Sequence, residues 1–238
     1  MSALDVRAFT VGPVQENCYI VRAADAGGAA SGGDPAPAVI VDPGDEPQRL
    51  LDAIAALNVK IEAILLTHCH FDHIGAVAPV ARATGAPVYC PEIERPLLTD
   101  IMAFVPPGFG PFESYDPEHT VSGGERLHLA GLDFDVIFTP GHSPGHVTYA
   151  VRSPTHPALL SGDVLFQGSV GRVDLPGGDW PTLERSIGSL LAAYPPDTVV
   201  YPGHMGVTTL ARERDSNPFL SELRERVPSA GNAGSPAA

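Results

Sequence analysis

The sequence predicts an α/β fold with four layers (αββα), in which two mixed β-sheets are stacked and sandwiched between helices. Short apolar runs alternate with stretches of helical periodicity along most of the 238 residues. Several of the apolar runs are bounded by Gly or Pro, as strand ends are. Because strands occur in runs with helices between them, layered sheets are favoured over an up-and-down helix bundle.

The individual elements follow from these patterns in chain order. A helix is expected over 47–57, because its leucines and Ile54 fall at helical spacing. The segment AGLD at 130–133 fits a hairpin turn. The predicted strands cover 4–10, 17–22, 38–42, 60–67, 86–90, 126–130, 133–139, 146–151, 157–162 and 197–202. The other predicted helices cover 74–84, 181–193 and 208–225.

The length fits a single large domain, which we expect to span 1–227. Residues 24–38, ADAGGAASGGDPAPA, have small side chains and no apolar anchor, so they predict a flexible insertion between two strands. The last eleven residues, 228–238, predict a disordered tail for the same reason.

Charge and cysteine content exclude several classes of protein. There are 14 basic and 28 acidic residues, a net charge of −14, and Lys60 is the only lysine. Nucleic-acid binding is disfavoured, because phosphate contacts need basic patches. A membrane protein is also disfavoured, since no apolar run approaches the ~20 residues of a spanning helix. The start does not resemble a secretory signal. Three cysteines make an odd and sparse set, so we expect a cytoplasmic protein without a disulfide framework.

The distribution of the nine histidines is the most informative feature. Three of them fall in THCHFDH at 67–73, directly after the apolar run IEAILL. A strand that ends in His68 and His70 places both imidazoles on one face, and Asp72 and His73 then lie in the turn before the next helix. Such N and O donors suit zinc, iron or manganese. The alternative, a polar surface loop, does not account for this density at a strand end.

Further candidate ligands follow other predicted strands. His142 and His146 flank SPG in TPGHSPGHV, Asp163 follows PALLSG, and His204 follows TVVYPG. Sites in layered α/β folds are assembled at such strand ends. Taken alone, an aspartate after a strand is more often a turn former or a cap. The remaining histidines match no such position and are expected at the surface: His119, His128 and His156.

In this order and spacing, these motifs resemble the metallo-β-lactamase superfamily, and the resemblance runs from about residue 10 to 220. It implies the four-layer metallo-β-lactamase fold. Within the superfamily the sequence is most similar to short bacterial hydrolases related to glyoxalase II, the hydroxyacylglutathione hydrolases. That similarity rests on ENCY, GRVDLPGGD and ERDSNPFL.

The resemblance implies two divalent metal ions per chain, with zinc expected and iron or manganese also compatible with the donors. The first metal would be held by His68, His70 and His146. The second would be held by Asp72, His73 and His204, with Asp163 as the bridge. His142 would then lie outside the ligand set, as would Cys69, whose side chain should point away from its neighbours.

The expected activity is metal-dependent hydrolysis, in which a metal-bound hydroxide attacks the carbonyl of a thioester such as an S-acylglutathione. Asp72 would hold a metal and orient the hydroxide. Arg172, nine positions after Asp163, matches the basic residue with which glutathione thioesterases of the family bind a carboxylate. Alternatively, Arg172 pairs with Asp174 or Asp179 to hold its loop.

Other functions stay open at this point. A lactonase or carboxylic ester hydrolase would use the same metals, and a mononuclear iron persulfide dioxygenase would use two histidines and an aspartate of the same loops. A non-catalytic metal-binding protein would not need an open coordination position. Full-length glyoxalase II has a helical C-terminal domain that contacts glutathione, whereas 34 residues follow His204 here. Glutathione recognition, the acyl group and the oligomeric state therefore remain open.

Overall fold

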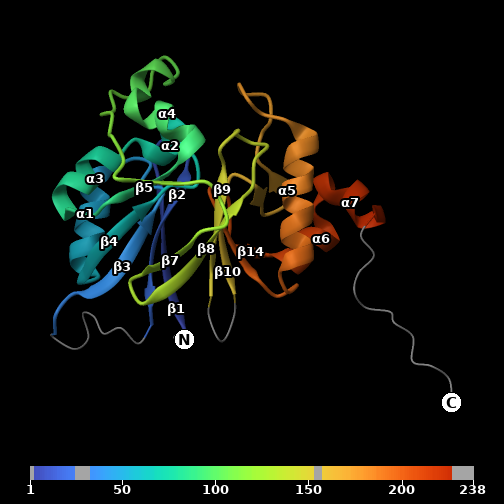
Figure 1. Cartoon of the computed structure of the whole chain (residues 1–238), viewed down its shortest axis with the longest axis horizontal. Coiled ribbons are helices and arrows are strands. Elements are labelled where there is room, and N and C mark those ends of the chain that lie inside the picture. Colours follow the sequence, from blue (N-terminus) through green and yellow to red (C-terminus); the bar gives the residue numbers. More distant parts are fainter. Residues whose placement is uncertain (1–2, 25–32, 153–156, 227–238) are drawn as a thin grey trace.

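The computed structural model describes residues 3–24, 33–152 and 157–226. Two six-stranded mixed sheets face each other, and helices cover both outer faces (Figure 1). The predicted four-layer αββα arrangement is thereby confirmed. None of the described helices is both long enough and apolar enough to cross a membrane.

The first sheet contains six strands in chain order. Its first three strands pair antiparallel and the remaining pairs are parallel. The strands are β1 (Leu4–Val11), β2 (Glu16–Ala23), β3 (Ala36–Val41), β4 (Val59–Leu65), β5 (Val88–Pro91) and β6 (His119–Val121).

Helices connect the parallel strands of the first sheet. α1 (Pro47–Ala56) joins β3 to β4, and its buried Leu50 and Ile54 confirm the helical spacing read from the sequence. β4 is followed by α2 (Phe71–Ile74) and α3 (Val77–Thr84). Between β5 and β6 lie three short helices: η1 (Glu92–Glu94), α4 (Arg95–Thr99) and η2 (Ile101–Ala103).

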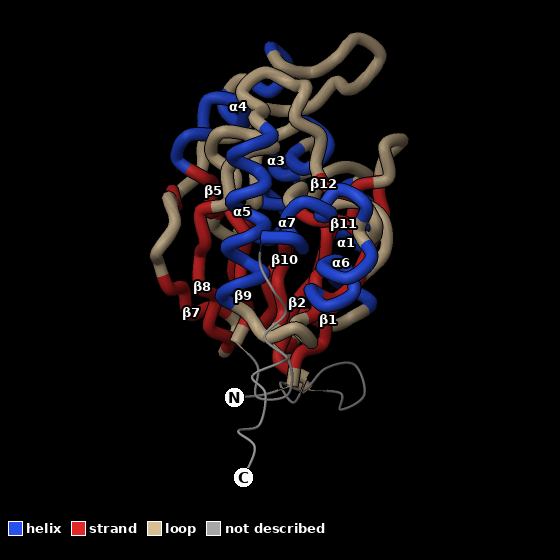
Figure 2. The backbone as a smooth tube through the Cα atoms, turned by 90° about the vertical axis from the view of Figure 1, so that its right-hand side faces the viewer, coloured by secondary structure: helices blue, strands red, loops and turns tan. Residues whose placement is uncertain are grey.

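The second sheet has the strand order β14-β13-β10-β9-β8-β7. Its strands are β7 (Arg126–Leu129), β8 (Leu132–Phe138), β9 (Val147–Val151), β10 (Ala158–Gly162), β13 (Val199–Pro202) and β14 (Thr208–Thr209). A separate hairpin consists of β11 (Leu165–Phe166) and β12 (Ser169–Val170). The helices that cover this sheet in Figure 2 are α5 (Trp180–Ala193), α6 (Leu210–Ser216) and α7 (Ser221–Arg226).

Three apolar clusters occupy the three interfaces between the four layers. One joins the first sheet to α1 and α3, for example through Leu50 and Ile64. The second lies between the sheets and includes Val41 and Tyr149. The third joins the second sheet to its helices and includes Leu183. Buried apolar surface on every interface stabilises the layers and fixes the strand ends relative to one another.

The structure differs from the predicted elements mainly at their ends. The strand predicted over 60–67 stops at Leu65, and the helix predicted over 74–84 begins only at Val77 as α3, because Ile74 is the last residue of the separate short helix α2. The helix predicted over 208–225 is interrupted because Pro218 starts a new turn, η3 (Pro218–Leu220), which the Asn217 side chain caps.

Two expected mobile segments fall largely outside the described residues. Of the insertion expected over 24–38, residues 25–32 are not described, while β3 begins at Ala36, two residues earlier than predicted. The tail expected over 228–238 also lies outside the described residues. The predicted hairpin turn is confirmed: Ala130 and Gly131 both have positive φ, at 52° and 71°, as a type I′ turn requires.

Candidate metal centre

The candidate ligands gather at one end of the two sheets, where several strands finish. The loop 67–73 leads from β4 into α2, Asp163 directly follows β10, and His204 lies two residues after β13. β10 and β13 are parallel neighbours, so the residues that follow them emerge at the same edge. His142 and His146 lie in the loop between β8 and β9.

Three histidines form the first group, which we call the histidine half: His68, His70 and His142. Their ligand nitrogens lie within 4.8 Å of one another, and His70 Nδ1 is 2.8 Å from His142 Nε2. The ring of His68, which is fully buried, lies 4.8 Å from that of His70 and 4.9 Å from that of His142. The arrangement offers three imidazole nitrogens to one ion.

The second group, the carboxylate half, comprises Asp72, His73 and His204. His204 Nε2 lies 3.3 Å from Asp72 Oδ2. Asp163 stands between the halves, because its Oδ1 is 3.4 Å from His73 Nε2 and its Oδ2 is 3.4 Å from His142 Nε2. This is the position in which a bridging ligand was expected.

The two histidines of the β8–β9 loop lie opposite to expectation. His142, expected outside the ligand set, stands in the histidine half. His146, expected inside it, has both ring nitrogens engaged within the fold. Its Nδ1 lies 3.0 Å from Thr139 Oγ1, and its Nε2 accepts the backbone N–H of Asp163 at 3.0 Å. The buried His146 ring therefore has no free nitrogen for a metal, and it supports the Asp163 loop instead.

Asp42, which was not identified as a site residue from the sequence, supports one imidazole of each half. It contacts His73 directly and His68 through Thr67. Its Oδ2 lies 3.1 Å from His73 Nδ1 and accepts the Thr67 hydroxyl at 2.6 Å. Thr67 Oγ1 in turn lies 3.1 Å from His68 Nδ1. Such partners fix the tautomer and orientation of a metal-binding imidazole. The signal in the sequence was the position of Asp42 directly after the apolar run of β3.

The buried Glu94, from the 3-10 helix after β5, was also not selected. Its carboxylate accepts the Gly145 N–H at 2.7 Å and the Cys69 N–H at 3.3 Å. It therefore ties the loop that carries His70 to the loop that carries His142. Nothing in the local sequence pattern distinguishes this glutamate from a surface one.

Comparison with known proteins agrees with this geometry. The metallo-beta-lactamase superfamily matches residues 11–204. The chain belongs to this superfamily. One relative, the hydroxyacylglutathione hydrolase GloC of Haemophilus influenzae, is 32% identical, and the match covers 92% of this chain and 99% of GloC.

Two solved structures extend the comparison. BLEG-1, a B3 metallo-beta-lactamase, is 37% identical with a TM-score of 0.81, over 91% of this chain and all (100%) of that one. TTHA1623, in a di-iron-bound form, is 41% identical with a TM-score of 0.69, over 90% of this chain and 100% of that one.

The superfamily implies divalent metals, and the residues of this chain fit them. Three buried atoms at the centre make no well-directed hydrogen bond within the described residues: His68 Nε2, His73 Nε2 and Asp163 Oδ1. An unpaired buried polar atom costs about 1–3 kcal/mol, which a bound cation would offset. Gly203 keeps the space open, because a side chain there would collide with Asp163 Oδ1 and the His73 ring. The donor set suits zinc, iron or manganese.

The two halves differ in their electrostatics. Burial lowers the pKa of His68 well below its ordinary value, and burial together with His142 lowers the pKa of His70 to about 4. Burial also acts to lower the pKa of His73, but the carboxylates of Asp163 and Asp72 outweigh it and raise that pKa well above its ordinary value. His68 and His70 therefore present neutral lone pairs, while the carboxylate half supplies the negative charge that a cation needs.

The centre opens into a cavity of about 600 Å³, which His70, Asp72, Asp163 and Arg172 help to line. The Arg172 guanidinium makes two contacts with Asp174, Nε to Oδ1 at 2.6 Å and Nη2 to Oδ2 at 2.7 Å. The pairing with Asp174 is the loop-holding arrangement, while carboxylate binding by Arg172 stays a prediction. The Arg172 backbone also has a role, because its carbonyl oxygen lies 2.7 Å from His142 Nδ1.

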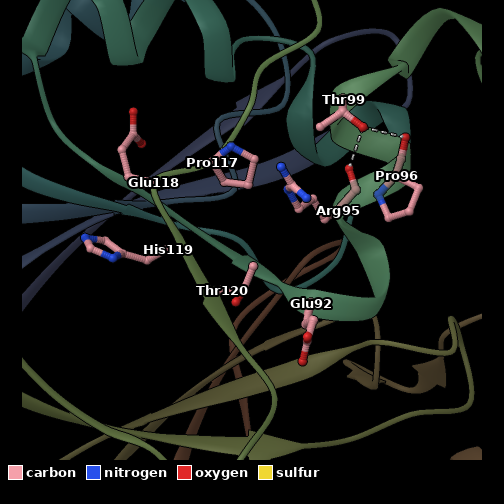
Figure 3. A pocket seen from close by; sticks show the side chains of 8 residues that line it. All are labelled: Glu92, Arg95, Pro96, Thr99, Pro117, Glu118, His119 and Thr120. Atoms are coloured by element: carbon pink, nitrogen blue, oxygen red, sulfur yellow. Dashed lines mark hydrogen bonds between the residues drawn. The ribbon is translucent and has the colours of Figure 1, made fainter.

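A second cavity, of about 450 Å³, lies between α4 and β6 (Figure 3). None of the metal-centre residues line it. Its most prominent cation, Arg95, is paired with Asp116 at 2.7 Å, and the Thr99 hydroxyl turns back to backbone carbonyls of its own helix. The cation and the Thr99 hydroxyl of this cavity are therefore both engaged within the fold.

Apart from His142, the residues expected to stay out of the ligand set do so where they are described. The Cys69 Sγ is buried 3.5 Å from Cys90 Sγ, and all three cysteines are free. His119 is exposed at the second cavity, and the exposed His128 pairs with Asp133 at 2.9 Å. His156 lies outside the described residues.

Proposed function

We propose that this protein is a dinuclear metal-dependent hydrolase, with one divalent cation, zinc in our assignment, in each half of the centre. The histidine half (His68, His70 and His142) would hold the first ion, the carboxylate half the second, and Asp163 would bridge them. The observation that carries the proposal is the convergence of His68 Nε2, His73 Nε2 and Asp163 Oδ1, buried atoms without a well-directed hydrogen bond, which belong to one group of possible ligand atoms within 4.8 Å of one another. The di-iron form of TTHA1623 supports a two-ion site.

Two cations bound there would supply a Lewis acid for a carbonyl oxygen and a water molecule of lowered pKa as nucleophile. The residues of the chain then have defined tasks. Asp72 lines the cavity and lies 3.3 Å from His204 Nε2, so its carboxylate can accept a hydrogen bond from the attacking water. Asp42 and Thr67 keep the imidazoles oriented.

The reaction that we propose is thioester hydrolysis, with S-acylglutathiones as the first substrate class. A thiolate leaves without protonation by a general acid, so the constellation needs no additional acid. The similarity to GloC supports this choice. The three buried, free cysteines fit the reducing conditions of the cytoplasm, where we place the protein.

The deciding experiment combines metal content per chain with hydrolysis of S-lactoylglutathione on freshly purified protein. We expect about two metals and turnover. His142→Gln should reduce both, whereas His128→Gln, at the exposed histidine paired with Asp133, is the matched control and should reduce neither.

Other results would assign the centre differently. A single iron, no thioester cleavage and oxygen uptake with glutathione persulfide would contradict the proposal in favour of a dioxygenase. Cleavage of lactones or simple esters without thioester cleavage would retain the hydrolase but replace its substrate class.

A further inference from the structure

The cavity beside the metal centre has an apolar wall that the chemistry at the metals does not require. We propose that this wall binds the apolar acyl chain of a thioester, and that the thiol part of the substrate is only weakly recognised. The inference rests on the proposed thioester hydrolysis and specifies its substrate class.

Exposed apolar side chains concentrate at this cavity. Of the eight large hydrophobic residues that are exposed among those described, four line it. These are Val14, Ile93, Phe104 and Met205, which are 37%, 56%, 56% and 57% exposed. They come from four separate segments of the chain, so their meeting at one opening does not follow from any single apolar stretch. Clustered exposed apolar side chains around a concave site are typical of a surface that binds an apolar ligand.

The wall is held in place by aromatic packing. Phe71, which lies between His70 and Asp72 in the sequence, lines the cavity. Its ring centroid is 4.7 Å from that of Phe109 and 6.3 Å from that of Phe112. Phe112 also packs against the first core cluster. The loop that carries Phe104 is therefore anchored directly beside the metal-binding loop.

Charge indicates that the glutathione part of an S-acylglutathione contributes little to its recognition. Glutathione carries two carboxylates and an ammonium group, and its binding requires cations that are free to pair with them. Arg172 is the only Lys or Arg among the described residues that line the cavity. Its guanidinium is already paired in a bidentate manner with Asp174, and the chain as a whole carries a net charge of −14.

The apolar part of the substrate is assigned to the acyl side on general chemical grounds. The thiols that carry acyl groups in metabolism, such as coenzyme A and glutathione, are polar group carriers. An apolar wall next to the reacting carbonyl therefore matches the acyl chain. Water attacks the thioester carbonyl carbon, the C–S bond breaks, the carboxylic acid loses its proton, and the thiolate takes up a proton from solvent.

The test compares metal-loaded full-length protein on N-acetylcysteamine thioesters of acetate, butyrate, hexanoate and octanoate, which share one small neutral thiol. We expect KM to fall with chain length, by up to roughly fourfold per added CH2. We also expect octanoyl-N-acetylcysteamine and octanoyl-glutathione to differ in KM by less than about fivefold.

Two phenylalanines of similar exposure provide the matched variants. Phe104→Ala should reduce the octanoyl-to-acetyl ratio of kcat/KM by at least about threefold. Phe219→Ala, at a side chain that is 51% exposed and outside the cavity, should leave that ratio unchanged. An equal fall in both variants, or no fall in Phe104→Ala, would overturn the assignment of the wall.

Failure of the inference and failure of the proposed function give different results. Hydrolysis of all four thioesters with equal KM, or a dependence on the length of the thiol rather than of the acyl chain, overturns the inference and leaves the hydrolase standing. If no thioester is cleaved, the proposed function fails, and calorimetric titration with octanoate and butyrate then decides whether the apolar wall binds an alkyl chain. Equal affinity for the two acids would overturn the inference as well.

Discussion

The two halves of the candidate metal centre differ in the pKa values of their histidines and in the charge that surrounds them. In the histidine half, burial lowers the pKa of His68 well below its ordinary value, and burial together with His142 lowers the pKa of His70 to about 4. In the carboxylate half, the pKa of His73 is raised because Asp163 and Asp72 surround it. His68 and His70 thus offer neutral lone pairs and the carboxylate half offers negative charge. In the proposed dinuclear centre, two ions would therefore be held by unequal environments, with Asp163 as the group common to both.

Removal of the Asp163 carboxylate, which is common to both halves, should have the largest effect on metal content and turnover. We expect Asp163→Ala to lose at least one metal per chain and to lower kcat/KM by more than about 100-fold, because a ligand matters more than the partners that orient it. Metal analysis and thioester turnover measure both quantities. Asp133→Ala, at an exposed aspartate that pairs with His128, is the control. Retention of both metals together with turnover would show that the ligand set is wrong.

The next largest effect is metal loss, which should distinguish the two histidines of the β8–β9 loop. His142→Gln should lose the ion of the histidine half, whereas His146→Gln should keep it, because His146 Nε2 already accepts the Asp163 N–H and an amide oxygen can do the same. The measurement is metal content per folded chain, with circular dichroism to establish folding. Metal loss confined to the His146 variant would support the ligand set expected from the sequence.

The opposite electrostatics of the halves predict a maximum of stability near pH 6.5 for protein stripped of metal by a chelator. Below about pH 6.5, the histidines of the unfolded chain bind protons, whereas His68, His70 and His146 stay neutral in the folded protein because their pKa values are lowered. The free energy of unfolding therefore falls as the pH falls. Above it, His73 keeps a proton that the unfolded chain has released, so its contribution is lost as the pH rises through its raised folded-state pKa. The buried Glu16, whose pKa burial raises, acts in the same direction.

For each proton by which the folded and unfolded states differ, the free energy of unfolding changes by about 1.4 kcal/mol per pH unit. Thermal unfolding between pH 5 and 9 measures the profile, and His68→Gln should flatten its acid side while His128→Gln changes neither side. Stability that rises steadily from pH 6.5 to 9 would contradict the raised pKa of His73.

The smallest effect concerns the Arg172 side chain, which lies outside both halves. Only its backbone carbonyl reaches the histidine half, at His142 Nδ1. We expect Arg172→Ala to change KM for S-lactoylglutathione by less than about fivefold, because the exposed guanidinium is already paired with Asp174. Asp174→Ala should free the cation and lower that KM. A larger rise in KM for carboxylate-bearing than for neutral thioesters in Arg172→Ala would show that Arg172 binds the substrate.

Much of the fold could be predicted from local patterns. The apolar spacing of α1 and the alternation of strands and helices were sufficient, because each depends on neighbours in sequence. The short elements β6, β11, β12 and α4 were not predicted, since two to five residues carry too little periodicity. The break at Pro218 shows that a long helical pattern can be interrupted by one residue without an N–H.

The sequence by itself determined the superfamily and the densest group of candidate ligands. THCHFDH places four candidate donors within seven residues, so covalent geometry limits the distances between them. Only the tertiary structure distinguishes the surroundings of His142 from those of His146, and only it reveals the contacts of Asp42 and Glu94 with the loops of the centre. Which nitrogen is free depends on hydrogen bonds from Thr139 and the Asp163 backbone. Those partners come from elements that meet through packing of the sheets, and packing between distant segments leaves no local pattern in the sequence.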